Sequence, residues 1–183
     1  MTRALLIIDI QNDYFPGGNK PLVNPEAAGE RAHALLEAFR QRGELVVHIR
    51  HLSVRKGASF FLPDTPGAEI HPCVQPIEGE PVFVKYYPNS FRDTGLDELL
   101  QEHKVRKLVV CGMMSNMCVD ATVRAAFDLK YFCTVAADAC AAPDLEFNGT
   151  LVPAAHVHAA FMAALASVYA QVKPVEEILD TVD

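Results

Sequence analysis

The sequence predicts an α/β fold whose mostly parallel sheet is covered by helices on both faces. Apolar runs of strand length alternate along the chain with longer amphipathic stretches, which is the order of β-α-β units. The first run, "RALLIID" (3–9), is continuously apolar, as is typical of a strand buried on both faces. The chain has 183 residues, half of them hydrophobic, and we expect residues 1–183 to form one domain.

The first helix has clear start and stop signals. Asn24 and Pro25 are typical of an N-cap and a first helical residue, and Gly43 is typical of a residue just past a helix end. We therefore expect a helix that begins at this pair and runs to Arg42.

Two later helices begin after polar residues that favour capping. Asp93 or Thr94 is expected to cap the first of them, and Ser115 or Asn116 the second. Residues 52–80 are rich in Pro and Gly, and irregular segments of that length inside compact domains are usually functional. The remaining predicted elements are strands over 44–51, 81–86, 105–112 and 131–138, helices over 95–104, 117–129 and 153–170, and a tail over 171–183 with a short strand and one helical turn.

Composition excludes several classes of function. The formal net charge of −7 argues against nucleic acid as a partner, because phosphate binding needs a clustered basic surface. The apolar run at the amino terminus is too short to span a membrane and lacks a signal-peptide pattern, so we expect no membrane partner. Five cysteines without framework spacing indicate free thiols in a reducing compartment, and so a cytoplasmic protein.

The sequence has no pattern typical of a cofactor or metal site. The glycine-rich segment "FPGGNKP" (15–21) contains neither G-x-G-x-x-G nor G-K-[ST], and G-x-S-x-G is absent from the chain. Neither C-x-x-C nor H-E-x-x-H occurs, and the two histidines of "HIRH" (48–51) point to opposite faces of a strand. We therefore expect no cofactor and no bound metal.

Three residues that can do chemistry lie at the carboxyl ends of predicted strands, where parallel sheets bind ligands. Asp9 ends the first strand, Lys85 ends the third, and Cys118 lies at the start of the helix after the fourth. A helix start lowers the pKa of a cysteine and favours the thiolate, whereas Cys111, inside a strand, is expected only to pack. Taken singly, each of the three is also compatible with a structural role, as a turn carboxylate, a surface lysine or a packed thiol.

Taken together, three motifs make the sequence resemble the isochorismatase-like cysteine hydrolases, which include nicotinamidases and N-carbamoylsarcosine amidohydrolases. The motifs are "DIQNDY" (9–14), "KYYPNSF" (85–91) and "CGMMSNMCVDATVRAA" (111–126), in the order and spacing of the family. The resemblance covers nearly the whole chain. It implies a three-layer α/β/α sandwich with a Rossmann-like, six-stranded, mostly parallel sheet.

The resemblance also implies a catalytic triad of Asp9, Lys85 and Cys118. It places a cis peptide bond between Met113 and Met114, with the backbone N–H groups of Met114 and Cys118 forming an oxyanion hole. The implied reaction is hydrolysis of a C–N bond in a small amide, ureide or carbamoyl compound through a thioester.

Two features of the sequence depart from the family pattern. Metal-dependent nicotinamidases of the family carry an Asp-x-His pair and a further His after the second strand. The corresponding segment here, "HIRHLSVRKG" (48–57), lacks that pair, which disfavours both a metal and nicotinamide as substrate. Met114 stands where a small residue such as threonine is frequent, which changes the shape of the pocket.

The substrate pocket is the least specified part of the prediction. Phe15, His51, Phe91 and Met113 are the predicted substrate-binding residues, and the segment 52–80, Tyr14 and Tyr86 are expected to contribute to specificity. This mixture of aromatic and apolar groups indicates a small, fairly neutral molecule. The resemblance further implies a homo-oligomer, a dimer or larger.

Two other functions stay open at the level of the sequence. One is the vinyl-ether hydrolysis for which the family is named, in which the aspartate acts as an acid without a nucleophilic cysteine. The other is a binding or regulatory module that has kept the fold without turnover. The presence of Cys118 disfavours the first, and a complete set of Asp9, Lys85 and Cys118 disfavours the second.

Overall fold

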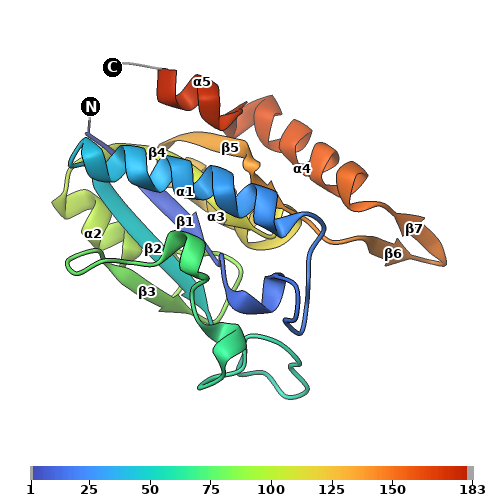
Figure 1. Ribbon diagram of the computed structural model, residues 1–183. Coiled ribbons are helices and arrows are strands. Elements are labelled where there is room, and N and C mark those ends of the chain that lie inside the picture. Colours follow the sequence, from blue (N-terminus) through green and yellow to red (C-terminus); the bar gives the residue numbers. More distant parts are fainter. Residues whose placement is uncertain (1, 181–183) are drawn as a thin grey trace.

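The computed structural model describes residues 2–180 and contains a six-stranded sheet between two layers of helices (Figure 1). The strand order is β3-β2-β1-β4-β5-β8, and every pairing in this sheet is parallel. The strands are β1 (Thr2–Ile8), β2 (Leu45–His51), β3 (Val82–Lys85), β4 (Val105–Met113), β5 (Phe132–Ala141) and β8 (Ala170–Lys173).

The helices cover the sheet in two layers because alternate residues of each strand point to opposite faces. Leu5 and Ile7 of β1 belong to the core beneath α1 and α5, while Leu6 and Ile8 belong to the core beneath α2, α3 and α4. The helices are α1 (Pro25–Gln41), α2 (Leu96–Glu102), α3 (Asp120–Asp128), α4 (Ala154–Val168) and α5 (Val175–Asp180). The α/β class, the three layers and the six parallel strands predicted from the sequence are confirmed.

A two-stranded hairpin of β6 (Leu145–Phe147) and β7 (Thr150–Val152) was not among the predicted elements. Its turn, Asn148-Gly149, has a positive φ at both residues, which is the geometry that this dipeptide favours in hairpins. The signal was therefore present in the sequence as "LEFNGTLV". The hairpin extends away from the sheet beyond the amino-terminal end of α4 (Figure 1). Of the predicted tail element, residues 181–183 lie outside the described residues.

Helix capping differs from the sequence prediction at two helices. Asn24 occupies the predicted N-cap position directly before Pro25, but it adopts the left-handed conformation and its side chain makes no capping bond to α1. Ser115 and Asn116 do not cap a regular helix either, because residues Ser115–Val119 form a π-helical turn before α3 begins. Thr94 does contact the start of α2 through its side chain, because its hydroxyl accepts a hydrogen bond from the N–H of Leu96 at 3.3 Å.

The carboxyl-terminal part of segment 52–80 is fastened to the body of the protein by Glu80. Its carboxylate accepts hydrogen bonds from Arg40 of α1 at 2.7 and 2.9 Å and lies 2.9 Å from Nε2 of the buried His48. Burial alone would raise the pKa of Glu80, but the hydrogen bonds from Arg40, the N–H of Ile77 and His48 together outweigh it and lower the pKa to about 2. This ion-pair network holds the loop against α1 and β2.

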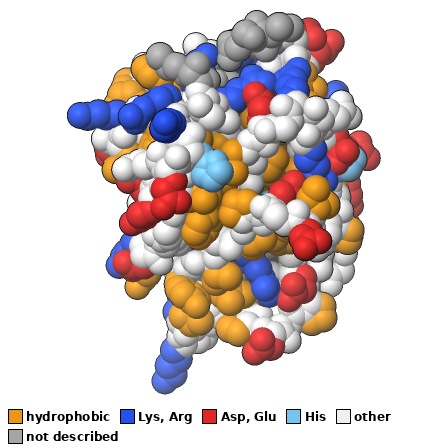
Figure 2. Space-filling model, turned by 90° about the vertical axis from the view of Figure 1, so that its left-hand side faces the viewer, with side chains coloured by type: hydrophobic (Ala, Val, Ile, Leu, Met, Phe, Trp, Pro, Cys, Tyr) orange, Lys and Arg blue, Asp and Glu red, His pale blue; other side chains and the backbone are white. Residues whose placement is uncertain are grey.

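The surface carries charges of both signs. On the face shown in Figure 2, basic and acidic side chains are interspersed, and hydrophobic side chains gather between them. Within the part of the chain that the structure describes, no helix has the length and apolar character needed to span a membrane.

Candidate active site

Asp9 is the first residue after β1, and the chain turns sharply there. Its φ of 51° lies in the left-handed region, which Asp tolerates better than most residues. Gly112 of β4 lies beside this turn with φ of 137°, and a Cβ at this position would strike the carbonyl oxygen of Ile8. A glycine is therefore required for β4 to run this close to the end of β1, where Asp9 is completely buried.

Lys85 joins Asp9 and Cys118 into one cluster. Its Nζ donates hydrogen bonds to Oδ2 of Asp9 at 2.7 Å and to Sγ of Cys118 at 3.3 Å. A third contact, at 2.9 Å, reaches Nδ1 of His51, so all three N–H donors of the buried ammonium are used. The other carboxylate oxygen of Asp9, Oδ1, is buried and has no hydrogen-bond partner in the described structure. The three residues singled out in the sequence therefore lie together, with one carboxylate oxygen free to accept a proton.

The charges in this cluster keep the thiol protonated at rest. Burial raises the pKa of Cys118 above its usual value, the carboxylate of Asp9 raises it further, and the ammonium of Lys85 only partly opposes them. Burial would lower the pKa of Lys85, but Asp9 and Cys118 together raise it above its usual value. The sequence expectation of a lowered pKa for Cys118 is thus not met, because burial and a neighbouring carboxylate outweigh a helix start.

The turn that carries Cys118 is irregular. The peptide bond between Met113 and Met114, the one expected to be cis, is cis in the structure. The carbonyl of Met114 then accepts hydrogen bonds from the N–H groups of Met117 and Val119 at 3.1 and 3.3 Å. These bonds hold the π-helical turn in which Cys118 lies, and this residue is only 6% exposed.

Ser115 fastens this turn to two neighbouring elements instead of capping a helix. Its hydroxyl donates to the carbonyl of Ala141 at the end of β5 at 3.1 Å, and lies 2.8 Å from Nδ1 of His158 on α4. A hydroxyl has one proton, so His158 is the donor in the second bond. The buried Ser115 thereby positions the turn from its amino-terminal side.

A cavity of about 300 Å³ opens over the thiol. His51 is the only one of the four predicted substrate-binding residues that lines it. Its walls are formed by Tyr14, His51, Ser53, Val54, Arg55, Phe60, Tyr86, Tyr87, Pro88, Met114, Met117 and Cys118. The segment 52–80, which is expected from the sequence to contribute to specificity, provides four of these residues.

The other three predicted substrate-binding residues do not reach the cavity. Phe15 is buried and stacks on His71, with ring centroids 3.6 Å apart. Phe91 lies against Tyr131, and Met113 is completely buried in the core beside α1. The sequence placed these side chains near the site but did not reveal the direction in which each points.

His51 is held as a neutral hydrogen-bond donor. Burial, and then the charge of Lys85, lowers the pKa of His51 to about 4, so the ring is uncharged near neutral pH. Because Nδ1 faces the ammonium of Lys85 and accepts from it, the proton of the neutral ring is on Nε2. Gln11 fixes the backbone of His51 on both sides, since it accepts from the N–H and donates to the carbonyl oxygen at 2.8 and 2.9 Å.

Several polar residues of the motifs support the site and were not assigned a role from the sequence. The buried carboxylate of Asp13 accepts from the N–H groups of Asn19 and Phe61, at 2.9 and 2.6 Å, and so ties segment 52–80 to the loop after β1. Thr122 of α3 bonds the hydroxyl of Ser90 at 2.9 Å, which joins the segment after Lys85 to the helix after Cys118. Asp13, Ser90 and Thr122 all lie within the three sequence motifs, and this was the one feature of the sequence that could have indicated a supporting role.

The cluster does not fit a metal ion. In the described residues, Asp9, His51 and Cys118 each offer a ligand atom, and these atoms lie within 4.8 Å of one another. The ammonium of Lys85 contacts all three residues and therefore already supplies the positive charge on which they converge. A metal would have to displace Lys85 from its ion pair with Asp9.

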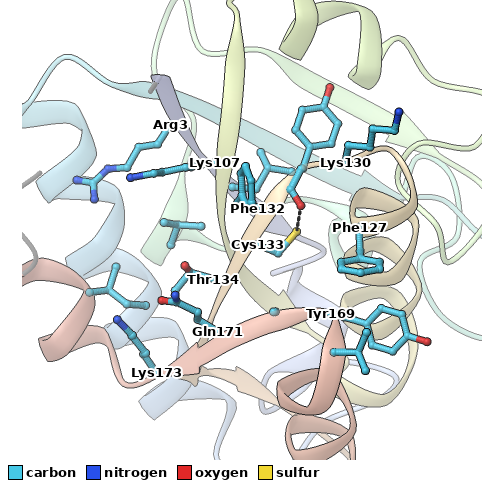
Figure 3. Close-up of a pocket in the computed structure, with 16 residues that line it drawn as sticks. Arg3, Lys107, Phe127, Lys130, Phe132, Cys133, Thr134, Tyr169, Gln171 and Lys173 are labelled. Atoms are coloured by element: carbon cyan, nitrogen blue, oxygen red, sulfur yellow. Dashed lines mark hydrogen bonds between the residues drawn. The ribbon is translucent and has the colours of Figure 1, made fainter.

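A larger cavity, of about 870 Å³, lies at the amino-terminal ends of β4, β5 and β8 (Figure 3). Among the described residues, its lining includes Cys133 but no acidic residue and no histidine. Burial raises the pKa of Cys133 to about 12, and its thiol donates to the carbonyl of Tyr131 at 3.8 Å. Without a base beside this thiol, the larger cavity lacks the groups for nucleophilic catalysis.

Comparison with known proteins gives consistent matches over the whole chain. The family model described as "Isochorismatase domain" matches residues 3–174. The isochorismatase family protein YddQ of Bacillus subtilis is 55% identical over 179 residues, covering 98% of this chain and 99% of that protein. A crystal structure from Oleispira antarctica, described as an isochorismatase hydrolase, has 54% identity and a TM-score of 0.93, with 97% of this chain and 96% of that chain covered. A nicotinamidase of Escherichia coli is 26% identical, over 91% of this chain and 94% of that protein.

Proposed function

The chain belongs to the isochorismatase family, and on this basis we propose that it is a cysteine hydrolase that cleaves the C–N bond of a small amide, ureide or carbamoyl compound. One observation carries the proposal: the ammonium of Lys85 contacts both a buried carboxylate and a buried thiol at the floor of a cavity. The relative named as a nicotinamidase supports an amide as the substrate class. The lack of a fit for a metal argues for chemistry carried by the protein's own side chains and backbone groups.

In the first step, Asp9 acts as a general base. Its free Oδ1 accepts the thiol proton of Cys118 while Sγ attacks the carbonyl carbon of the substrate. Lys85 stays positively charged and offsets the negative charge as it moves from the carboxylate toward the sulfur and the substrate oxygen. The N–H groups of Met114 and Cys118 are proposed to receive that oxygen, and one such donor typically contributes about 3–4 kcal/mol to transition-state stabilisation.

In the second step, the C–N bond breaks and Asp9 returns the proton to the leaving nitrogen. A water then enters, gives a proton to Asp9 and attacks the thioester carbonyl, which releases the carboxylic or carbamic acid. The sulfur regains its proton from Asp9, and the site returns to its resting state. His51 is proposed to bind substrate through its Nε2–H, since it lines the cavity as a neutral donor.

The test is a panel of amides, ureides and carbamates assayed for release of ammonia or amine. We expect at least one class to be hydrolysed by the natural protein and its turnover to fall by about 10³-fold or more in Cys118→Ala. Cys73→Ala is the matched control, because this half-buried thiol lies outside the cavity and burial raises its pKa to about 11. Equal loss in both variants, or unchanged turnover in Cys118→Ala, would refute nucleophilic catalysis by Cys118.

The vinyl-ether alternative is tested with the same variants. If isochorismate is hydrolysed equally well by the natural protein and by Cys118→Ala, Asp9 acts as an acid and the thiol is not the nucleophile. Absence of turnover on every compound, together with saturable binding of one of them, would instead favour a binding module.

A further inference from the structure

Tyr14 combines a rigid position with a hydroxyl group that has no partner. It ends the 3₁₀ turn Asn12–Tyr14 after Asp9, and its ring packs against Phe61 and Phe60 with centroids 4.5 and 5.9 Å apart. The side chain is 1% exposed and lines the cavity over Cys118. Its hydroxyl makes no hydrogen bond to any group in the described part of the chain, although the oxygen is not sealed from solvent.

The environment keeps this hydroxyl a donor. Burial raises the pKa of Tyr14 well above its usual value, and the neighbouring acidic groups Cys118 and Asp9 raise it further because they disfavour a second negative charge, so the phenol stays neutral. Because the oxygen is not sealed from solvent, water can serve as its partner while the cavity is empty. A substrate that fills the cavity displaces such water, and the donor is then left unpaired unless the substrate supplies an acceptor.

We infer that Tyr14 is a specificity-determining residue, whose hydroxyl selects substrates carrying a hydrogen-bond acceptor on the acyl group. This inference rests on the proposed C–N hydrolysis for the identity of the reacting bond. The proposed oxyanion donors already bind the oxygen of the reacting carbonyl, so the acceptor for Tyr14 belongs to a second group. The acceptor is a carbonyl, an ether, a ring nitrogen or a carboxylate, and the apolar walls formed by Phe60, Met114 and Met117 surround the rest of the molecule.

The selectivity follows from a difference in free energy: leaving a buried donor without a partner is more unfavourable than forming its hydrogen bond is favourable. The cavity therefore penalises an analogue that lacks the acceptor. We expect the natural protein to favour the member of an isosteric pair that has the acceptor by about 10- to 100-fold in kcat/KM.

The test compares Tyr14→Phe with the natural protein on isosteric pairs of amides. Each pair differs only by replacement of CH with N, or of CH₂ with O, on the acyl side, as in the three pyridinecarboxamides against benzamide. Tyr14→Phe keeps the ring that packs on Phe61 and removes only the hydroxyl. We expect the preference for the acceptor-bearing member to fall to about 3-fold or less, through a lower kcat/KM for that member alone.

Tyr131→Phe is the matched control. This buried tyrosine donates its hydroxyl to Asp97 at 2.6 Å and does not line the cavity over Cys118, so the variant should keep the full preference. A preference that persists in Tyr14→Phe, or equal losses on both members of every pair, would overturn the inference.

Binding separates failure of this inference from failure of the proposed function. The same pairs are titrated by calorimetry into Cys118→Ala protein with and without Tyr14→Phe, which requires no turnover. A preference in binding that depends on Tyr14, without any hydrolysis by the natural protein, would support the role of Tyr14 and refute C–N cleavage. Turnover without any acceptor preference, or binding in which Tyr14→Phe changes nothing, would refute the role of Tyr14 alone.

Discussion

Asp9→Asn should make Cys118 a better target for alkylation while it strongly reduces hydrolysis. The carboxylate of Asp9 raises the pKa of the thiol, so its removal lowers that pKa and increases the thiolate fraction at a given pH. In the natural protein the Asp9–Lys85 pair is neutral with a protonated thiol. In Asp9→Asn, the neutral combination is the thiolate beside the ammonium of Lys85.

The distance between the groups sets the size of the effect. An oxygen of Asp9 and the sulfur of Cys118 lie within 4.8 Å of each other. Two unit charges at that separation repel by about 3.5 kcal/mol at an effective dielectric constant near 20, equivalent to a few hundredfold in thiolate. Because Lys85 also loses an anionic partner, part of this gain is lost, and we expect alkylation to accelerate by about a hundredfold.

The assay is the rate of iodoacetamide modification of Cys118, followed by peptide mapping between pH 6 and 9. The other four cysteines are internal controls, because general loosening of the fold would accelerate their modification as well. Amide turnover should fall by about 10³-fold in the same variant, since no general base remains. If Asp9→Asn is alkylated at the rate of the natural protein or more slowly, the carboxylate does not suppress the thiolate, and the electrostatic reasoning is wrong.

Three further predictions concern stability. Lys85→Met leaves the buried carboxylate of Asp9 without its cation, so the free energy of unfolding in urea titrations should fall by about 3–5 kcal/mol. A loss below about 1 kcal/mol would mean that the Asp9–Lys85 pair is not buried as described. Gly112→Ala should lower the free energy of unfolding by more than about 2 kcal/mol, because the added Cβ meets the backbone of Ile8 and the φ is unfavourable for alanine. Gly57→Ala is the control: no atom lies near its Cβ, so the free energy of unfolding should fall only by the cost of the unfavourable φ. Glu80→Gln should be less stable than the natural protein above about pH 4.5, and the difference in stability should disappear as the pH falls toward 2. The reason is that a carboxylate with a lowered pKa stabilises the fold only while it is ionised. A difference in stability that persists at about pH 2 would contradict this.

The backbone architecture was predictable because its signals are strong and periodic. Continuous apolar runs fixed the buried strands, and the alternation with amphipathic stretches fixed their parallel order. The rule that ligands bind beyond the carboxyl ends of parallel strands then brought Asp9, Lys85 and Cys118 together before any contact was known. The register shift between Val110 and Gly112 had no comparable signal, since it depends on how β4 and β5 pair.

The lining of the pocket was much less predictable. Tyr14 and Phe15 are adjacent aromatic residues, yet one lines the cavity and the other stacks on His71 outside it. Which of two neighbours faces the site depends on the 3₁₀ turn at Asn12–Tyr14, and that turn is held by backbone hydrogen bonds and by the carboxylate of Asp13. Such contacts span distant segments, so no local pattern encodes them.

The largest difference between expectation and structure, the protonation state of Cys118, also bears on how the site works. A thiolate made permanently available by a helix start would be open to oxidation and alkylation at all times. Here burial and Asp9 hold the thiol protonated, and in the proposed mechanism the group that suppresses the thiolate is also the base that removes its proton. On this mechanism the thiolate forms only as a carbonyl in the cavity takes up the negative charge. The positive charge of Lys85 balances the carboxylate before the proton moves and the sulfur after it, so the cluster has no net charge in either state.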